Sequence, residues 1–258
     1  MGKLQRQILQ TAVRQLIGDQ NQHLYHSLDW AQACAAFQQR ELQYPDYYAQ
    51  DFHGIKGGYL TPVAAVTYDA VTALASPPSE EGLRHQLIQQ VAGQPRHILD
   101  LGCGTGSTTV KLKQAFPTAT VIGVDLSPYM LVMASRKAQA AGISIEWQQG
   151  LAETTHREPG RFDLITASML FHELPPSQSQ LVLREALRLC KPGGQVLTLD
   201  GNQTQLRRLD WLIQLFREPY SKLYAAESVE DWMQSLGYRT QPTRYVGWIH
   251  QINVGYKP

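Results

Sequence analysis

Three glycines alternate with other residues immediately after an apolar run that contains a carboxylate. The run is Ile98–Leu101, its carboxylate is Asp100, and the glycines are Gly102, Gly104 and Gly106. Because glycine lacks a Cβ atom, this spacing lets the backbone turn tightly and approach a ligand closely. A helix expected directly afterwards would point its free N-terminal amides at the same place. A simple strand-to-helix turn usually needs one glycine, so the pattern favours a ligand loop of the nucleotide-binding type.

A second carboxylate, Asp125, follows the next apolar run, Val121–Val124. The carboxyl ends of neighbouring parallel strands lie at one edge of a sheet, so Asp125 is expected beside the glycine loop. A carboxylate at that place can accept hydrogen bonds from both hydroxyl groups of a ribose. The alternative is that Asp125 caps the helix beginning near Pro128, but Ser127 can cap that helix itself.

The glycine spacing bears on which nucleotide the loop would hold. Dinucleotide-binding loops have the spacing G-x-G-x-x-G, and the third glycine of that pattern would fall on Ser107. The spacing found here, G-x-G-x-G, therefore counts against a nicotinamide-dependent oxidoreductase. That class of enzyme stays open as an alternative.

From Ile98 onward, apolar runs alternate with helical stretches, which predicts a parallel sheet covered by helices on both faces. The expected strands are Ile98–Leu101, Val121–Val124, Ile143–Trp147, Phe162–Ala167 and Gln195–Leu199. The expected helices between them are Ser107–Ala115, Pro128–Ala140 and Ser177–Cys190. The last helix is followed by Lys191-Pro192-Gly193-Gly194, which is typical of a helix end.

The C-terminal part departs from simple alternation. A long, aromatic-rich helical segment is expected from Leu206 to about Leu236. Two short runs, Thr243–Trp248 and Gln251–Tyr256, suit a hairpin that would give the sheet an antiparallel strand at its end.

The N-terminal part is expected to form a helical extension or lid over residues 1–78, and residues 79–258 form the main domain with a helical insertion at about 203–237. Helical spacing of apolar residues marks the first two segments of the extension, Leu4–Leu16 and Leu28–Phe37. Further helices are expected over Ala64–Ala73 and, beyond the extension, from about Glu80 to Val91.

Composition and charge exclude several classes of protein. The chain has 258 residues, of which 43% are hydrophobic, enough for a sizeable core. Its 23 basic and 22 acidic residues give a net charge of +1, so no nucleic-acid or membrane partner is expected. Cys34, Cys103 and Cys190 lack the spacing of a disulfide framework or a zinc site, so we expect no metal and a cytoplasmic location. No apolar run suggests a signal peptide or a membrane helix.

Four motifs in order over about residues 90–200 resemble those of the class I S-adenosylmethionine-dependent methyltransferases. They are Asp100-Leu-Gly-Cys-Gly-Thr-Gly, Val-Asp125-Leu-Ser-Pro-Tyr-Met, Phe162-Asp163-Leu164 with Phe171-His172-Glu173-Leu174, and Leu189-Cys190-Lys191-Pro192-Gly193-Gly194. The resemblance implies an α/β, Rossmann-like sheet of seven strands in the order 3-2-1-4-5-7-6, with the last strand antiparallel. It also implies S-adenosyl-L-methionine as the cofactor.

The resemblance assigns contacts with the cofactor to residues of the first two motifs. Asp100 would lie near the methionine amine. The loop amides from Gly102 through Cys103 and Gly104 to Gly106 would pass beneath the methionine and the ribose. Asp125 would hold the ribose hydroxyl groups.

The adenine end departs from the family pattern. Leu126 and Met130 would contact the adenine. After the third strand the family usually has Gly-Asp-Ala, but this chain has Gly150-Leu151-Ala152-Glu153, so the acid is missing from its usual place. Either Glu153 or a backbone carbonyl substitutes, or adenine binding depends on the Ala152 amide and stacking. Backbone atoms of Ala167 and Ser168 would complete the methionine end.

His172 is the candidate catalytic residue. In methyl transfer from a sulfonium the cofactor carries the hard chemistry, so the protein supplies positioning, exclusion of water and in some enzymes a base. His172 follows the fourth expected strand at the edge where a substrate would meet the cofactor, and an imidazole suits proton transfer at neutral pH. The alternative is that His172 only fixes the loop before Pro175.

Aromatic residues gather between Tyr44 and Tyr68 without a clear period, which indicates a loop that holds something. They could wall an active site and face a sulfonium through cation–π contact, or they could only pack the extension onto the domain. Two or three are expected to touch a ligand. The candidates are Tyr47, Tyr48, His53, Tyr59 and Tyr68, and the expected substrate contacts are Tyr48, His53, Tyr59, Tyr68 and His172.

A second aromatic stripe recurs at helical spacing in the C-terminal segment. Such stripes are more often part of a core or a dimer surface than of a substrate pocket. Its members are Trp211, Phe216, Tyr220 and Tyr224.

Together these features predict transfer of a methyl group from S-adenosylmethionine to a small organic molecule, by a monomer or a homodimer. The stretch Ser168-Met169-Leu170-Phe171 lacks the Asn/Asp-Pro-Pro-aromatic string of enzymes that methylate amino groups of nucleic-acid bases. The alternatives are the nicotinamide-dependent oxidoreductase and a non-catalytic scaffold or sensor that binds S-adenosylmethionine. The acceptor atom is left open.

Overall fold

The computed structural model describes residues 24–39, 41–75, 79–209, 211, 213 and 217–258. The helix expected over Leu4–Leu16 and the stripe member Phe216 lie outside the described residues.

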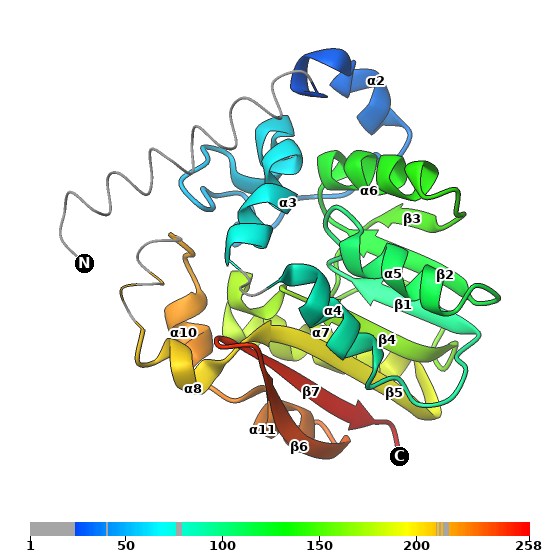
Figure 1. Ribbon diagram of the computed structural model, residues 1–258, viewed down its shortest axis with the longest axis vertical. Helices are drawn as coiled ribbons and strands as arrows, with labels where there is room; N and C mark the ends of the chain where they lie inside the picture. The colour runs from blue at the N-terminus through cyan, green and yellow to red at the C-terminus, as the bar shows by residue number, and fades with distance from the viewer. Residues whose placement is uncertain (1–23, 40, 76–78, 210, 212, 214–216) are drawn as a thin grey trace.

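A seven-stranded sheet runs through the molecule in the order β3-β2-β1-β4-β5-β7-β6, as expected (Figure 1). Strands β1 to β5 pair in parallel, whereas β7 is antiparallel to both β5 and β6. This confirms the predicted Rossmann-like topology with a reversed strand at its end. The strands are β1 His97–Leu101, β2 Thr120–Asp125, β3 Glu146–Gln149, β4 Phe162–Ser168, β5 Cys190–Gly201, β6 Arg239–Val246 and β7 His250–Tyr256.

Helices cover both faces of the sheet, and successive residues of a strand serve opposite faces. Leu99 and Leu101 belong to one hydrophobic cluster together with residues of α7 (Pro176–Leu189) and α11 (Val229–Ser235). Ile98 belongs to the other cluster, which includes residues of α4 (Glu80–Ile88) and α5 (Ser107–Ala115). Burial on both faces explains why the parallel strands read as continuous apolar runs.

Helix α6 (Pro128–Ala140) begins as its sequence predicts. Ser127 is the N-cap, and its side-chain oxygen accepts a hydrogen bond from the Met130 amide at 3.3 Å. Pro128 occupies the first turn, where its missing N–H costs nothing. Since Ser127 caps the helix, Asp125 is not needed as the cap.

Several expected boundaries were wrong, among them that of β6, which covers Arg239–Val246 in place of the expected Thr243–Trp248. Helix α2 covers only Trp30–Ala35 of the expected Leu28–Phe37, since Asp29 caps it by accepting the Gln32 amide. Strand β3 begins later than expected because the Ile143 amide still closes the end of α6, donating to the Ala138 carbonyl at 3.1 Å. Strand β5 begins at Cys190, directly after α7, so the Pro-Gly-Gly segment lies inside the strand.

The single long helix expected from Leu206 to Leu236 was also wrong. The described residues form α8 (Gln203–Leu206), α10 (Ser221–Ala226) and α11. New N-caps start two of these short helices, because Asn202 accepts the Gln205 amide and Ser228 accepts the Asp231 amide. Pro219 lies between α8 and α10, where it disfavours a continuous helix.

The aromatic stripe of this segment divides between core and surface. Tyr224 is fully buried and its hydroxyl donates to the Gly201 carbonyl at 2.8 Å, which confirms the core role. Trp211 is exposed. Tyr220 packs against the N-terminal segment, where its hydroxyl accepts a hydrogen bond from the Gln50 amide group at 2.6 Å.

The N-terminal segment packs against α6 through a third hydrophobic cluster that joins Phe52, Tyr59, Ala64 and Ala65 to Met130. It contains the short 3-10 helix η1 (Gly58–Leu60) and helix α3 (Pro62–Ala75). Figure 1 shows α2 and α3 on the α6 side of the molecule, away from β6 and β7.

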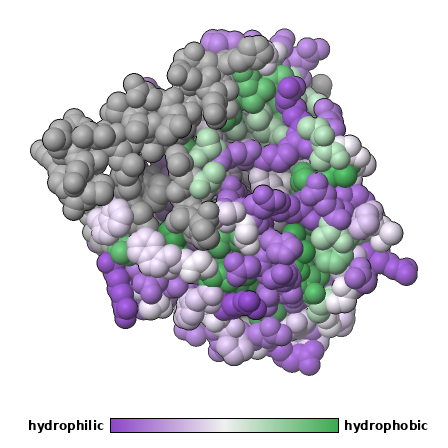
Figure 2. Space-filling model, in the orientation of Figure 1, coloured by the Kyte–Doolittle hydropathy of each residue, from purple (hydrophilic) through white to green (hydrophobic). Residues whose placement is uncertain are grey.

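The surface and the cysteines carry few special features. Figure 2 shows hydrophilic residues spread over the described part of one face, with hydrophobic residues between them. Each helix among the described residues is too short or too polar to cross a membrane. The three cysteines are buried and unpaired.

Candidate active site

The loop between β1 and α5 holds all three glycines in the left-handed region, with φ of 63° at Gly102, 54° at Gly104 and 77° at Gly106. At two of them, other side chains of the protein occupy the space where a Cβ atom would lie. A Cβ atom on Gly102 would lie 2.6 Å from Leu170, and one on Gly106 would lie 2.7 Å from Trp147.

Gly104 is different from the other two loop glycines. A Cβ atom there would meet only the ring of Tyr68, at an ordinary contact distance of 3.8 Å. Of the three loop glycines, Gly104 therefore has the least crowded position, and its neighbour there is an aromatic ring from α3.

Asp125 ends β2 directly beside this loop, as expected. One of its side-chain oxygens accepts the Gly104 amide and the other accepts the Ser127 amide, each at 2.8 Å. Burial raises the pKa of this carboxyl to about 6, although the two amides oppose the shift. A buried carboxylate is thus held at the loop by backbone donors alone.

Asp100 lies beneath the loop rather than at its surface. It is 1% exposed, and its two oxygens accept hydrogen bonds from the hydroxyls of Thr109 and Thr166, each at 2.6 Å. Burial raises its pKa. Asp100 therefore joins β1 to α5 and β4, and the two threonine partners were missed by the sequence analysis.

Three further residues expected to contact the cofactor are buried, namely Cys103, Leu126 and Met130. Cys103 is buried, with its sulfur against Gly123, and burial raises the pKa of its thiol. Leu126 is buried, and its carbonyl accepts the Gln149 amide group at 3.0 Å. Met130 packs under the N-terminal segment.

The remaining expected cofactor residues follow β3 and β4. Leu151 forms an isolated bridge with Thr154, and Ala152 packs against the core. Ser168 ends β4, and its buried hydroxyl oxygen has no hydrogen-bond partner among the described residues. A buried hydroxyl without a partner at this edge is a group that a ligand could satisfy.

The chain segment before α3 closes over the end of β3. Gln149 accepts the Gln39 amide at 2.8 Å, and Tyr47 donates its hydroxyl hydrogen to Glu153. Glu153, two residues after the place of the missing family acid, has its carboxylate engaged with Tyr47. Neither contact could be predicted from local sequence, because the two partners of each lie more than 100 residues apart.

The expected aromatic residues form a cluster around Tyr59, which stacks on Phe52 and meets Tyr68 edge to face. The ring of Tyr59 lies 4.9 Å from that of Phe52, 6.0 Å from Tyr68 and 6.2 Å from Tyr48, measured between centroids. Burial raises the pKa of Tyr48, Tyr59 and Tyr68, so these hydroxyls stay protonated.

A cavity of about 90 Å³ lies beside this cluster. Of the five expected aromatic or histidine candidates, three line it: His53, Tyr59 and Tyr68. His172 lines it as well. Apolar side chains complete the wall, and they are Ile55, Ala64, Val71, Met169, Leu206, Ile213 and Ile249.

His172 is held by a residue that the sequence analysis missed. Its Nδ1 atom lies 2.6 Å from Oδ1 of Asp200, near the end of β5. Burial lowers the pKa of His172, but the Asp200 carboxylate and then Glu218 outweigh burial and raise the pKa well above its ordinary value. The neighbouring carboxylates thus favour the protonated imidazole, which must lose a proton before it can act as a base.

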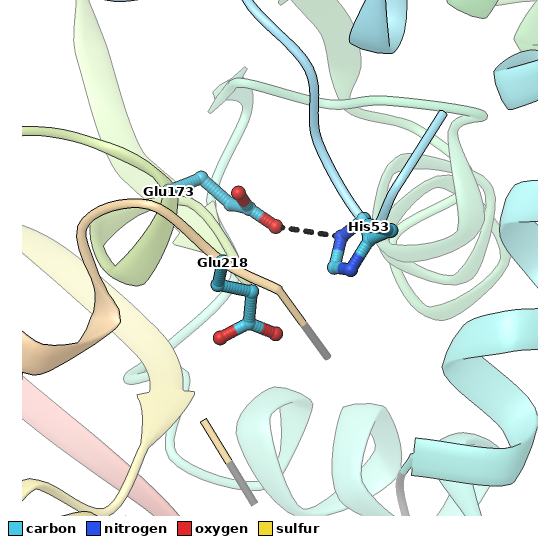
Figure 3. Close-up of side chains that lie close together, drawn as sticks. All are labelled: His53, Glu173 and Glu218. Atoms are coloured by element: carbon cyan, nitrogen blue, oxygen red, sulfur yellow. Dashed lines mark hydrogen bonds and ion pairs between the residues drawn. The ribbon is translucent and has the colours of Figure 1, made fainter. Parts of the chain in front are cut away.

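Two further carboxylates, Glu173 and Glu218, lie beside the two histidines. Nε2 of His172 is 3.5 Å from Glu173 and 3.9 Å from Glu218. Nε2 of His53 lies 2.9 Å from Glu173, and Figure 3 shows these two side chains pointing toward one another. Burial lowers the His53 pKa, but Glu173 outweighs it and raises the pKa to about 8.

Comparisons with known proteins agree with this arrangement. Residues 98–194 match the family model of a methyltransferase domain. The chain is 35% identical over 106 residues to a demethylmenaquinone methyltransferase of Thermus thermophilus, which covers 41% of this chain and 47% of that protein. It is 30% identical over 164 residues to a ubiquinone biosynthesis O-methyltransferase of Pseudomonas aeruginosa, which covers 63% of each chain. The chain spans about half the length of the first curated relatives it matches.

Solved structures share the fold. A methyltransferase from Aquifex aeolicus that depends on S-adenosylmethionine has a TM-score of 0.58 at 18% identity, covering 73% of this chain and 98% of that chain. A phosphoethanolamine N-methyltransferase 2 from Haemonchus contortus, in complex with S-adenosyl-L-methionine, has a TM-score of 0.60 at 15% identity, covering 77% and 57%. Residues 98–194 are thus similar to a methyltransferase domain, and the chain shares the seven-stranded fold of methyltransferases that bind S-adenosylmethionine.

Proposed function

We propose that this protein transfers a methyl group from S-adenosylmethionine to a small hydroxylated aromatic molecule. One observation carries the proposal. Gly104 lies against the ring of Tyr68, at the contact distance of 3.8 Å that a Cβ atom would have, and Tyr68 also lines the cavity. A ligand lying on the glycine loop would therefore adjoin a second molecule in the cavity, as a transfer between two ligands requires.

The residues of the loop fit the cofactor. Asp125 lies at the loop with a carboxylate that can accept ribose hydroxyls, and Ser168 has a buried hydroxyl without a partner among the described residues. When bound, the cofactor supplies a methyl group on a positively charged sulfur. The contacts proposed for Asp100, Gly102, Cys103, Gly106, Leu126, Met130, Leu151 and Ala152 complete this site.

The residues of the cavity would hold the acceptor. The rings of Tyr59 and Tyr68 and the apolar wall exclude water and accept a flat apolar molecule. In its neutral form, His172, which Asp200 fixes through Nδ1, takes the proton that an acceptor hydroxyl gives up, and Nε2 is the atom assigned to this role. Tyr48 and His53 support the wall from the N-terminal segment.

The acceptor class follows from two lines of support. The cavity combines an apolar and aromatic wall with one side that bears histidine and carboxylate groups. Two relatives bear names that refer to menaquinone and ubiquinone biosynthesis. A quinol or a similar phenol presents both an apolar ring and a hydroxyl group, so it matches both sides of the cavity. The unpaired, buried cysteines support a location in the cytoplasm.

Calorimetric titration with S-adenosylmethionine, followed by measurement of S-adenosylhomocysteine released with a panel of quinols and phenols, tests the proposal. We expect saturable binding at one site and product with at least one acceptor. Binding of NADH in place of the sulfonium cofactor would instead support the oxidoreductase. Tight cofactor binding without product for every acceptor would support the non-catalytic scaffold.

A further inference from the structure

We propose that His53, Glu173 and Glu218 bind a divalent transition-metal ion at the wall of the cavity. One ligand atom from each of the three side chains lies within 4.8 Å of the other two. The residues come from the N-terminal segment, from the 3-10 helix η2 (Phe171–Glu173) and from the segment before α10 (Figure 3). Small side-chain rotations would bring these atoms to the ~2.0–2.2 Å metal distances typical of such ligands.

The balance of charge at this place favours a cation. Two buried carboxyl groups, Glu173 and Asp200, and the partly buried Glu218 lie beside two imidazoles, His53 and His172. With all of these groups charged, one negative charge is left over, and burial raises the pKa of Glu218 and so disfavours its charge. No lysine or arginine lies among the described residues that line the cavity. Buried charge that side chains do not balance is expensive, and a metal ion is one of the few groups that can balance it.

One carboxylate oxygen supplies independent support. Oε1 of Glu173 accepts the Tyr59 hydroxyl at 2.7 Å and contacts His53 at 2.9 Å. Oε2 of the same side chain has no hydrogen-bond partner among the described residues. This oxygen is buried, and the whole side chain is only 9% exposed. An unsatisfied buried acceptor of this kind costs free energy unless a ligand completes it.

The donor set indicates which metals would bind. One imidazole nitrogen with two carboxylates suits Zn²⁺, Mn²⁺ or Fe²⁺ rather than Ca²⁺, which prefers oxygen ligands alone. Three protein ligands leave a position open for another molecule, as in catalytic metal sites. The hydroxyls of Tyr59 and Ser221 already donate to the two glutamates, which is typical of the outer shell around metal ligands.

The backbone conformation at two residues gives further support to the metal site. His53 has φ of 53° and Arg217, directly before Glu218, has φ of 54°, both in the left-handed region. Residues other than glycine adopt this conformation at a cost, and such positions cluster at functional sites. Both strained residues therefore fix the two ligands that come from irregular segments.

A bound ion would face the molecule in the cavity. His53, Glu173 and Glu218 line the same cavity as Tyr68 and His172, so the open metal position would bind an oxygen of the acceptor. This role toward the acceptor rests on the proposed function. The metal site itself does not, because it depends only on the ligands present.

Titration of the full chain with Co²⁺, after treatment with a chelator and without S-adenosylmethionine, tests the site through the visible absorbance of the bound ion. We expect one Co²⁺ per chain. His53→Ala and Glu218→Gln should each weaken binding by ~100-fold or more, because loss even of an outer-shell partner costs ~10–100-fold. His85→Ala and Glu81→Gln are matched controls on the exposed side of α4 and should bind as the native protein does.

The thermal unfolding and the S-adenosylmethionine affinity of each variant show whether it folds, and Glu218→Gln preserves the shape of the side chain if His53→Ala does not fold. Native protein that binds no Co²⁺, or folded variants that bind it as tightly as native protein, would overturn the metal site. Co²⁺ binding that the variants lose, in a protein that forms no S-adenosylhomocysteine, would uphold the metal site and refute the proposed function instead.

Discussion

Asp200 fixes the position of His172. Its Oδ1 lies 2.6 Å from Nδ1 of His172, while its Oδ2 accepts the amides of Phe171 at 2.7 Å and Leu170 at 3.1 Å. A single buried carboxylate at the end of β5 therefore holds both the backbone of η2 and the imidazole. Because Nδ1 is engaged, Nε2 is the ring atom left to serve the cavity.

Replacement of His172 tests its role in proton transfer. His172→Asn should lower kcat by about 10²–10⁴-fold, the usual contribution of a positioned base, and leave S-adenosylmethionine affinity unchanged. Steady-state kinetics with calorimetric titration measures both quantities. His85→Asn, on the exposed side of α4, is the control. Native kcat in His172→Asn would leave His172 with only a structural role.

Replacement of Asp125 tests the ribose contact. Asp125→Asn should weaken S-adenosylmethionine binding by about 10–100-fold, because hydrogen bonds to a charged acceptor contribute about 1.5–3 kcal/mol. Asp163→Asn is the matched control, since Asp163 lies near the beginning of β4, away from the loop. Equal cofactor affinity in the two variants would contradict the assignment.

The pH dependence of cofactor binding should follow Asp125. Burial raises its pKa from 3.8 to about 6 in the protein without ligand, so the carboxyl becomes protonated as the pH falls below that value. Affinity for S-adenosylmethionine should then decrease by about tenfold per pH unit below 6, whereas the stability contributed by this group increases. Calorimetric titration between pH 5 and pH 8 measures the effect, and Asp125→Asn should abolish it.

Substitution of two loop glycines should affect stability and cofactor binding differently. Gly106→Ala puts a methyl group 2.7 Å from Trp147 at a positive φ, so it should lower the free energy of unfolding by about 2–4 kcal/mol. Gly104→Ala meets only Tyr68 at 3.8 Å, so it should cost about 1 kcal/mol and mainly weaken the cofactor. Urea denaturation and calorimetry distinguish the two. The reverse order of stabilities would show that Gly104 serves packing.

Protonation of Asp163 should destabilise the protein at low pH. Burial opposes ionisation, but the Lys191 ammonium and the amides of His97 and Arg96 outweigh it and lower the pKa to about 2. The stabilisation is therefore present above pH 4 and disappears as the pH falls from 4 to 2. After allowance for solvent screening, Asp163→Asn should cost about 1 kcal/mol at pH 7 and nothing at pH 2, as measured by urea denaturation.

Local signals explain why the loop half of the site could be predicted. Gly104 and Asp125 each follow a buried strand, and parallel strands bring such residues to one edge whatever the rest of the chain does. Ser127 and Pro128 mark a helix start through contacts within four residues. Apolar periodicity and capping residues therefore located this loop and its strands.

Residues that meet only through the fold could not be predicted in the same way. His53 and Glu173 are 120 residues apart, and neither belongs to a metal-binding or catalytic spacing. The long helix expected through Tyr224 failed for a related reason, because the local caps at Asn202 and Ser228 compete with apolar periodicity.

The sequence by itself determined the alternation of strands and helices, the glycine loop and the carboxylate beside it, since these depend on apolar periodicity and on backbone freedom at glycine. The order of the strands followed from the resemblance of its motifs to a known family. Only the tertiary structure decided that Asp200 holds His172 and that Glu173 and Glu218 gather with His53. Those groupings depend on how the N-terminal segment and the chain after β5 fold across the carboxyl edge of the sheet. Packing over that distance, rather than any local preference, sets the chemistry of the cavity.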